Sequence, residues 1–489
     1  MSAPKELWPS RMNPTDALFW YMDKIPDLRS TIGSLIILER APTHAAIRAE
    51  IDRIGRLLPR MRQRVVEVPF GLAPPEWVED PLFDLDYHLR FVAVPEPAGL
   101  EEALDVMGPL YASPFDYERP LWETYVIEGL RDGCGAVFMK MHHCSTDGVG
   151  GARLSEQLMR EMPAAVRPEE HLAGPERSTT PAAMLWRALG YNLEEAISTG
   201  LGLLGAVGDM LLSPGETVDT IRRSVRALAG LGQQMSAPAV RSAPNAPRSL
   251  SRRLSTFEMS LREIDAVREQ WGATNNDVVL TIVAGAMHRW HTARGDDTRE
   301  LRVLVPVNLR GGEDVQAGNR IAMVSITLPI GEPNPVRRLR IIQERTGRVK
   351  TDRRASLYPV LARVMLAMPR VLTERLSRQQ STMANFVCTN VPGSRQTAYM
   401  AGIAVKAIYP WGPLVGDHPM AIALYSYGDT LYVGLDVDPL AMRDLPAFRD
   451  ALRESYEEVL NVGRRTARRT RPRARRAPRA RRTPARSSA

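Results

Sequence analysis

Apolar positions in the first third of the chain alternate between strand-like runs and helical periodicity. Residues 43–58, for example, carry isoleucines three and four positions apart and end at Pro59. On the same reasoning, strands are predicted over residues 32–39, 121–127 and 135–143, and helices over residues 43–58, 100–110 and 149–162. Residues 1–165 are therefore interpreted as a mixed α/β domain.

A second stretch with α/β patterning covers residues 251–463. Helices are predicted over residues 261–271, 277–291, 335–350, 357–377 and 444–462, and strands over residues 301–308, 321–328, 385–390, 403–408, 420–427 and 430–437. The helix over 277–291 is apolar on most faces, which predicts that it is buried. Only Gly428 and Asp429 separate the last two strands, a pattern typical of a hairpin.

The segment between these stretches, residues 166–250, has a different pattern of residues. Prolines punctuate it, and two helical patterns cover residues 182–212 and 216–231. It is interpreted as a partly helical crossover between two domains. The chain then closes with residues 464–489, which hold twelve arginines and no acidic residue, and which are predicted to be disordered.

Charge is distributed unevenly over the 489 residues. The whole chain carries a net charge of +8, and without the twelve arginines of the tail, residues 1–463 carry −4. Any affinity for polyanions is therefore assigned to the tail. Specific nucleic-acid binding is disfavoured because the tail has no aromatic residue, whereas attraction to an anionic membrane or lipid-droplet surface fits a polybasic arm.

Composition narrows the class of protein further. Hydrophobic residues make up 44% and charged residues 25%, which excludes wholesale disorder. The longest apolar stretch, residues 201–212, contains Asp209 and is shorter than the ~20 residues of a membrane-spanning helix. No secretory signal is expected, and Cys134, Cys144 and Cys388 form neither a disulfide framework nor a zinc spacing, so a cytoplasmic location is predicted.

Most of the candidate catalytic residues lie within residues 135–151. Side chains alternate along a strand, so His142 and His143 are expected to point to opposite faces. The strand ends at His143, and the turn residues Asp147 and Gly148 follow. A neutral imidazole at such a strand end suits general-base catalysis because its pKa lies near neutrality. Asp147 could orient the imidazole, or it could hold the loop by pairing with an arginine.

Two other kinds of site are disfavoured by the same segment. A metal site is unfavourable because adjacent strand residues point apart and no third ligand follows at a recognisable spacing. A nucleophilic cysteine is unfavourable because Cys144 directly follows His143, and no Gly-x-Ser-x-Gly elbow is present. Cys144 is instead interpreted as an inert buried thiol.

The segment His142-His143-Cys144-Ser145-Thr146-Asp147-Gly148 is similar to the His-His-x-x-x-Asp-Gly signature of coenzyme A-dependent acyltransferases. From Met12 to Val462 the chain resembles the bacterial wax ester synthase/diacylglycerol acyltransferase family. Further matching motifs, in chain order, begin at Asn13 (Asn-Pro-Thr-Asp-Ala-Leu-Phe), Pro120 (Pro-Leu-Trp), Asn276 (Asn-Asp), Pro306 (Pro-Val-Asn-Leu-Arg), Gly318 (Gly-Asn-Arg) and Thr389 (Thr-Asn-Val-Pro-Gly). Asn13 stands where the family has serine, and Cys144-Ser145 replaces a more usual apolar pair.

The resemblance implies an α/β fold with two acyltransferase-like domains, each a mixed sheet with flanking helices, facing each other across a channel. It implies that His143 is the general base, with His142 in a supporting role. Asp147 is expected to fix the loop, with Arg310 as its partner. Asn276 is expected either to donate a hydrogen bond to the oxyanion or merely to cap its helix.

Substrate contacts are also implied by the resemblance. Pro120, Leu121, Trp122 and Gly148 are expected to lie along the substrate channel, with a plain core role as the alternative for Trp122. Acyl-coenzyme A is a co-substrate, and neither a metal nor a prosthetic group is expected.

The leading functional hypothesis is a diacylglycerol O-acyltransferase that forms triacylglycerol. The alternatives are a wax ester synthase, an acyltransferase for a more complex lipid alcohol, and a catalytically dead scaffold that binds anionic surfaces through the tail. The sequence also predicts peripheral association of a cytoplasmic protein with membrane or lipid inclusions, and it leaves the oligomeric state open.

Overall fold

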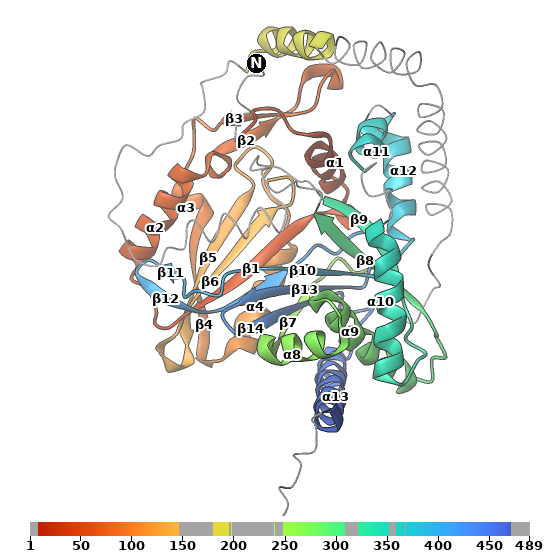
Figure 1. The fold of residues 1–489 in the computed structure, drawn as a ribbon. Helices are drawn as coiled ribbons and strands as arrows, with labels where there is room; N and C mark the ends of the chain where they lie inside the picture. The colour runs from red at the N-terminus through yellow and green to blue at the C-terminus, as the bar shows by residue number, and fades with distance from the viewer. Residues whose placement is uncertain are drawn as a thin grey trace, which may run out of the picture.

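The computed structural model describes residues 8–145, 179–194, 197, 239, 248–308, 321–351, 358–366 and 368–470. Its described strands form two six-stranded mixed sheets and one small hairpin, with helices on the outer sides of the sheets (Figure 1). The α/β class, with two mixed sheets and flanking helices, is therefore confirmed. The helices predicted over 149–162 and 216–231 lie outside the described residues.

The first sheet has the strand order β11-β12-β1-β6-β5-β4. Its strands are β1 (Thr31–Leu38), β4 (Leu89–Ala98), β5 (Trp122–Leu130), β6 (Gly135–His142), β11 (Tyr399–Met400) and β12 (Ile403–Trp411). Helices α2 (His44–Leu57) and α4 (Leu100–Ala112) bury their apolar sides in the same core as these strands. Only β4 and β5 pair in parallel, so the centre of this sheet is antiparallel.

The second sheet has the strand order β7-β14-β13-β10-β8-β9. Its strands are β7 (Arg253–Ser260), β8 (Leu301–Asn308), β9 (Ile321–Leu328), β10 (Phe386–Val391), β13 (Met420–Tyr427) and β14 (Thr430–Val437). The helices that share its core are α8 (Leu261–Trp271), α9 (Asn275–Thr292), α10 (Pro335–Thr351) and α13 (Leu445–Thr470). The predicted hairpin of β13 and β14 is confirmed.

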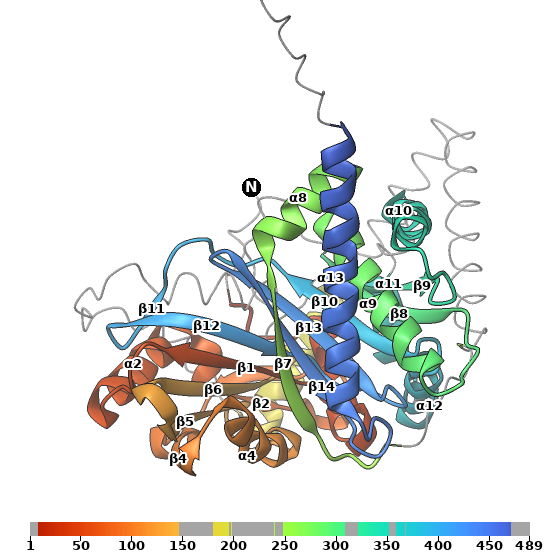
Figure 2. The ribbon, with the colours of Figure 1, turned by 90° about the horizontal axis from the view of Figure 1, so that it is seen from below.

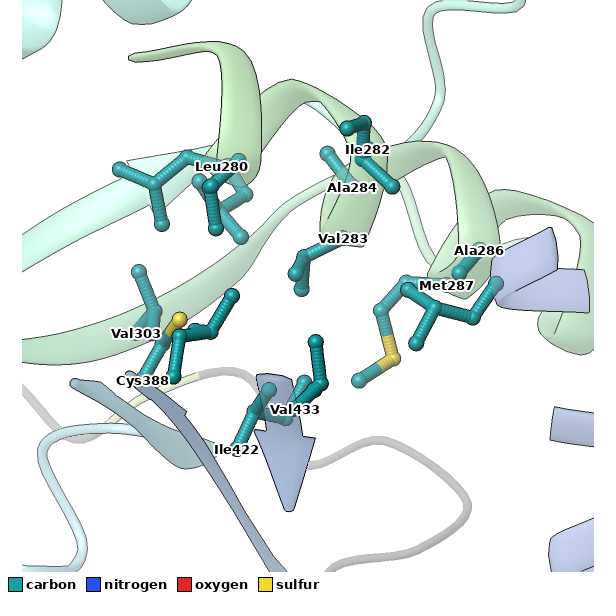
Figure 3. Close-up of a cluster of buried hydrophobic side chains, with 14 of the residues drawn as sticks. Leu280, Ile282, Val283, Ala284, Ala286, Met287, Val303, Cys388, Ile422 and Val433 are labelled. Atoms are coloured by element: carbon teal, nitrogen blue, oxygen red, sulfur yellow. The ribbon is translucent and has the colours of Figure 1, made fainter. Parts of the chain in front are cut away.

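Helix α9 lies at the centre of the second core, as its apolar sequence predicts. Its side chains Leu280, Val283 and Met287 point toward residues of the sheet such as Ile422 and Val433 (Figure 3). Helix α13 packs alongside α9 and extends beyond the sheets (Figure 2). Burying one such aliphatic side chain stabilises the fold by about 1.5–3 kcal/mol.

The two sheets meet where β12 passes over β14. Strand β12 comes from the second half of the sequence, yet it pairs with β1 of the first sheet. Gly434 of β14 has no side chain, which allows the backbone carbonyl of Pro410 to come directly against it. Tyr409 of β12 also hydrogen-bonds Glu258 of β7. The halves of the sequence are thus interlocked, and the predicted division into residues 1–165, 166–250 and 251–463 stays a prediction.

Shorter elements complete the described structure. They are α1 (Pro14–Asp23), α3 (Leu85–His88), α11 (Tyr358–Leu366), α12 (Arg370–Ser381), the hairpin β2 (Gln63–Val66) and β3 (Glu76–Glu79), and the 3-10 turns η1 (Pro26–Leu28), η2 (Pro59–Met61), η3 (Pro69–Gly71) and η4 (Arg131–Gly133). A further helix covers residues 181–194. Among these helices and those above, none is long and apolar enough to cross a bilayer.

The single helix predicted over residues 357–377 is wrong. The structure divides this region into α11 and α12, and Pro369 stands immediately before α12 with an extended ψ of 138°. A proline lacks a backbone N–H and clashes with the preceding turn, so a helix cannot continue smoothly through it. Apolar residues keep a helical spacing on both sides of Pro369, so the spacing alone does not predict this break.

Candidate active site

The two adjacent histidines lie at the end of β6, where the strand turns away from the sheet. Phe138, Lys140 and His142 are buried, whereas Met141 and His143 on the alternate positions are half-buried. This is the alternation that the sequence predicts. The strand therefore inserts His142 into the protein and leaves His143 on the more accessible side.

His143 is held by its backbone and by its ring. Its backbone N–H donates to the carbonyl oxygen of Ser30, at 2.8 Å, just before β1 begins. Its imidazole stacks on the ring of Phe19 in α1, with centroids 4.5 Å apart and an interplanar angle of 23°. Two elements from the start of the chain thus fix the position of the predicted general base.

His142 is fixed by a buried carboxylate. Its Nδ1 accepts a hydrogen bond from the backbone N–H of Cys144 at 2.9 Å, so the ring hydrogen lies on Nε2. That Nε2 is 3.3 Å from Oδ1 of Asp23, the last residue of α1. Asp23 also accepts hydrogen bonds from the Ser30 N–H, at 2.6 Å, and from the Tyr117 hydroxyl, at 2.9 Å. One carboxylate therefore contacts His142 directly and reaches the backbone of His143 through Ser30.

The electrostatics of this cluster follow from burial and from these partners. Burial raises the pKa of the Asp23 carboxyl, but His142, the Ser30 N–H and the Tyr117 hydroxyl lower it below its usual value, so it is ionised at neutral pH. Burial lowers the pKa of His142, but its interactions with Cys144 and with the Asp23 carboxylate outweigh burial and raise this pKa above its usual value. Burial also raises the pKa of Cys144, which keeps it a thiol, as expected for an inert cysteine.

Helix α1 owes its position to the motif that begins at Asn13. The Asn13 side chain accepts a hydrogen bond from the Asp16 N–H at 2.9 Å and caps the helix, and Pro14 occupies its first turn. Phe19 and Asp23 are four residues apart, so both project from one face of α1 toward the histidines. Asp23 was not predicted as a site residue, although its four-residue spacing from Phe19 is a signal that could have revealed it.

The Pro120–Trp122 segment lies directly beside the histidines. The carbonyl oxygen of Leu121 accepts the His142 N–H at 3.0 Å. The Trp122 ring is buried, donates to the carbonyl oxygen of Met61 at 2.8 Å and stacks on His88. These contacts give Trp122 a core position. The expected contribution of Pro120, Leu121 and Trp122 to a substrate channel stays a prediction.

Asn276 lies half-buried in the first turn of α9. The expectation that Asn276 could be the helix cap is wrong, because Thr274 accepts the capping hydrogen bond from the Asp277 N–H at 3.2 Å. Asp277 in turn accepts a hydrogen bond from the buried Thr346 hydroxyl of α10 at 2.7 Å. Asp277 thus joins two helices, and a contact of Asn276 with the oxyanion stays a prediction.

The expected loop residues Asp147 and Gly148, and the expected partner Arg310, lie outside the described residues. In the part of the chain that the structure does describe, no group of three or more histidine, cysteine, aspartate or glutamate side chains is arranged to hold a metal ion.

Comparison with protein families gives two matches that together span most of the chain. Residues 12–279 match the wax ester synthase/diacylglycerol acyltransferase catalytic domain, and residues 317–459 match the WS/DGAT C-terminal domain. A Mycobacterium tuberculosis protein provisionally named a diacylglycerol O-acyltransferase (Rv2484c) is 31% identical over 474 residues, which cover 94% of each chain. A second protein of that organism with a similarly provisional name, tgs1, is 28% identical over 443 residues, covering 89% of this chain and 92% of its own.

Two solved structures share the fold. The wax ester synthase/diacylglycerol acyltransferase of Marinobacter aquaeolei VT8 superposes with a TM-score of 0.59 at 24% identity, covering 93% of this chain and 99% of that one. The first condensation domain of the calcium-dependent antibiotic synthetase superposes with the same TM-score at 16% identity, covering 94% and 97%.

Fold and sequence together define an acyl-coenzyme A-dependent O-acyltransferase. The chain belongs to the wax ester synthase/diacylglycerol acyltransferase family.

Proposed function

We propose that this protein transfers a long-chain acyl group from acyl-coenzyme A to the hydroxyl of diacylglycerol and so forms triacylglycerol. The observation that supports it most is the placement of His143 at the end of β6, fixed by Ser30 and Phe19 on the more accessible side of the strand. The names of the mycobacterial relatives favour diacylglycerol as the acceptor.

In the proposed mechanism, His143 removes the proton of the acceptor hydroxyl while the oxygen attacks the thioester carbonyl. The tetrahedral intermediate then collapses, the carbon–sulfur bond breaks, and the proton passes from His143 to the departing thiolate of coenzyme A. A positioned general base contributes about 10²–10⁴-fold in rate. Asn276 is proposed as a donor to the oxyanion, and Asp147, paired with Arg310, as the residue that orders the loop.

A long-chain alcohol is the second candidate acceptor. The Marinobacter protein with the same fold carries both activities in its name. The same proton transfer through His143 would then give a wax ester, and the reaction would differ only in the molecule that supplies the hydroxyl.

A thiol-release assay with palmitoyl-coenzyme A tests the proposal, with diacylglycerol and hexadecanol offered separately. We expect release with diacylglycerol, and we expect His143→Ala to reduce kcat at least 10²-fold with an unchanged circular dichroism spectrum. The exposed His44 provides the control, because His44→Ala should leave kcat unchanged. Release only with hexadecanol would reassign the acceptor, and full activity of His143→Ala would overturn the mechanism.

The proposed substrates are lipids, so we also propose a cytoplasmic location with peripheral association with membrane or lipid inclusions. The twelve arginines of residues 464–489 favour an anionic surface, at about 1 kcal/mol for each basic residue near it. Vesicle binding of the chain without residues 471–489, which hold eight of the twelve arginines, tests the contribution of this tail.

A further inference from the structure

The helix over residues 181–194 is apolar on its outer side as well as on the side that packs against the protein. Met184 and Ala188 pack inward against Val68 and Ala73. Arg187, the only charged residue between positions 181 and 193, also turns inward, where it binds Glu76 at 2.7 Å. The only basic residue of this helix is therefore used to attach it to the protein.

Its opposite side is apolar and exposed. Trp186, Leu189 and Leu193 follow one another at intervals of three and four residues, so they form one stripe. Their exposed fractions are 75%, 55% and 62%. On a helical wheel this stripe lies opposite Met184 and Ala188. Contact between a continuous apolar surface and water is unfavourable, and monomeric proteins rarely expose such a surface without a partner.

The neighbouring turn η3 extends the apolar surface. Phe70 is 90% exposed and Leu72 is 44% exposed. The turn is attached to the helix because Asn192 Nδ2 donates to the carbonyl oxygen of Leu72 at 2.9 Å. Phe70 also has a φ of 60°, a left-handed conformation that is uncommon for a bulky residue. The backbone therefore projects the phenyl ring outward from the body of the protein.

Basic side chains border this surface. Glu67, next to Val68, binds both Lys24 at the end of α1 and Arg370 at the start of α12, the latter at 3.1 Å. Arg370 is 71% exposed at the side chain and is followed by the exposed Val371 and Leu372. The segment 358–381 contains four arginines and one acidic residue. Exposed aromatic and aliphatic groups beside cations are the chemistry of a peripheral membrane-binding surface.

We propose that this surface, formed by Phe70, Leu72, Trp186, Leu189, Leu193 and the first turn of α12, docks on a phospholipid surface that contains anionic lipids. The apolar side chains enter the headgroup region, and Lys24 and Arg370 contact the lipid phosphates. The proposal rests on the proposed function, because it names the surface from which that site would take its lipid acceptor.

The position of the surface relative to the site supports this assignment. Helix α1, which carries Phe19 and Asp23, ends at Lys24 on the border of the surface, and α11 packs Ala362 and Met365 against its other side. Figure 1 shows the helix over 181–194 along the top, with α1, α11 and α12 below it in the upper half of the molecule. Helix α13 runs toward the opposite side of the molecule. Docking through the folded surface and docking through the arginine tail therefore orient the molecule differently.

Flotation with phosphatidylcholine/phosphatidylglycerol vesicles (about 70:30) tests the proposal on the full-length protein. We expect the triple variant W186Q/L189Q/L193Q to lose at least tenfold in its partition coefficient, because it removes three apolar groups from the contact. The matched control is L82Q/L440Q, which alters two side chains that are 80% and 60% exposed elsewhere. This control should bind vesicles as the wild type does.

The readout is vesicle binding, so it is independent of acyl transfer, and a failure of the proposed function would be seen separately in the thiol-release assay. Equal binding of the wild type and the triple variant would overturn the proposal, as would loss of binding only on removal of residues 471–489. A concentration-dependent dimer in sedimentation velocity that the triple variant abolishes would instead identify the surface as an interface between two copies, and would also overturn it.

Discussion

Asp23 is the residue on which the geometry of the site depends most. Its carboxylate lies beside His142 and accepts the N–H of Ser30, whose own carbonyl oxygen accepts the N–H of His143. The side chain of the first histidine and the backbone of the second are thus held by the same buried group. Asp23 acts as a positioning residue, because it contacts His142 and not the predicted general base itself.

Asp23→Asn tests this role. The amide keeps the shape but removes the charge that favours one orientation of His142, so we expect His143 to be displaced and kcat to fall about 10²-fold. KM should change much less, because the substrate contacts are not altered. Steady-state kinetics of thiol release provides both constants, and Asp86→Asn, at an exposed carboxylate, is the control. An unaltered kcat in folded Asp23→Asn would contradict the assignment.

At the scale of secondary structure, the sequence predicted the most regular elements well. The predicted bounds of α8, β8, β9, β13 and β14 agree with the structure because each has an uninterrupted apolar pattern between clear turn residues. The strands β4 and β7 were missed, since charged and polar residues interrupt their patterns. Helix α1 was not predicted from its apolar pattern, although the motif that begins at Asn13 covers its first residues.

Only those features of the site that depend on neighbouring residues in the sequence could be predicted. Strand alternation placed His142 and His143 on opposite faces because that property depends on consecutive residues. The contacts of Ser30 and Asp23 with the histidines join segments more than a hundred positions apart, and no periodicity encodes them. The pairing of β12 with β1 is invisible for the same reason.

A buried ion pair between β6 and β5 also holds strand β6 in place. Nζ of Lys140 lies 3.1 Å from Oε2 of Glu123 on β5 and donates to the carbonyl oxygen of Ser113 at 2.8 Å. Both side chains are almost completely shielded from water. Lys140 is two residues before His142 on the same face, so this pair fixes the strand that carries the histidines.

Lys140→Met should destabilise the protein strongly, because it removes the nearer cation of the buried Glu123 carboxylate and leaves only Arg90, at 3.8 Å. We expect a loss of about 3–5 kcal/mol in the free energy of unfolding, measured by urea denaturation at pH 7. The double variant K140M/E123Q removes the stranded charge as well and should recover part of the loss. A double variant as unstable as the single one would show that the charge is not the cause.

At the scale of the whole molecule, the two sheets behave as interlocked halves. The loop after β12 contacts the first half of the chain, where the Gly416 N–H donates to the carbonyl oxygen of Asp27 at 2.7 Å. The Arg248 guanidinium bridges the same two segments through the carbonyl oxygens of Gly416 and Asp27. His418 is buried in this loop, so the junction contains a titratable group that water cannot reach.

The stability of this junction should depend on pH through His418. Burial, together with the positive charge of Arg248, lowers the pKa of His418 to about 4, whereas an unfolded histidine titrates near 6.5. As the pH falls from 6.5 to 4, the unfolded state takes up a proton that the folded state does not, so stability decreases, by up to about 3 kcal/mol from this residue. Urea denaturation of the wild type and of His418→Gln between pH 7 and pH 4 measures this effect. On acidification we expect the unfolding free energy of the wild type to fall more than that of His418→Gln. Equal decreases in the two proteins would contradict this role of His418.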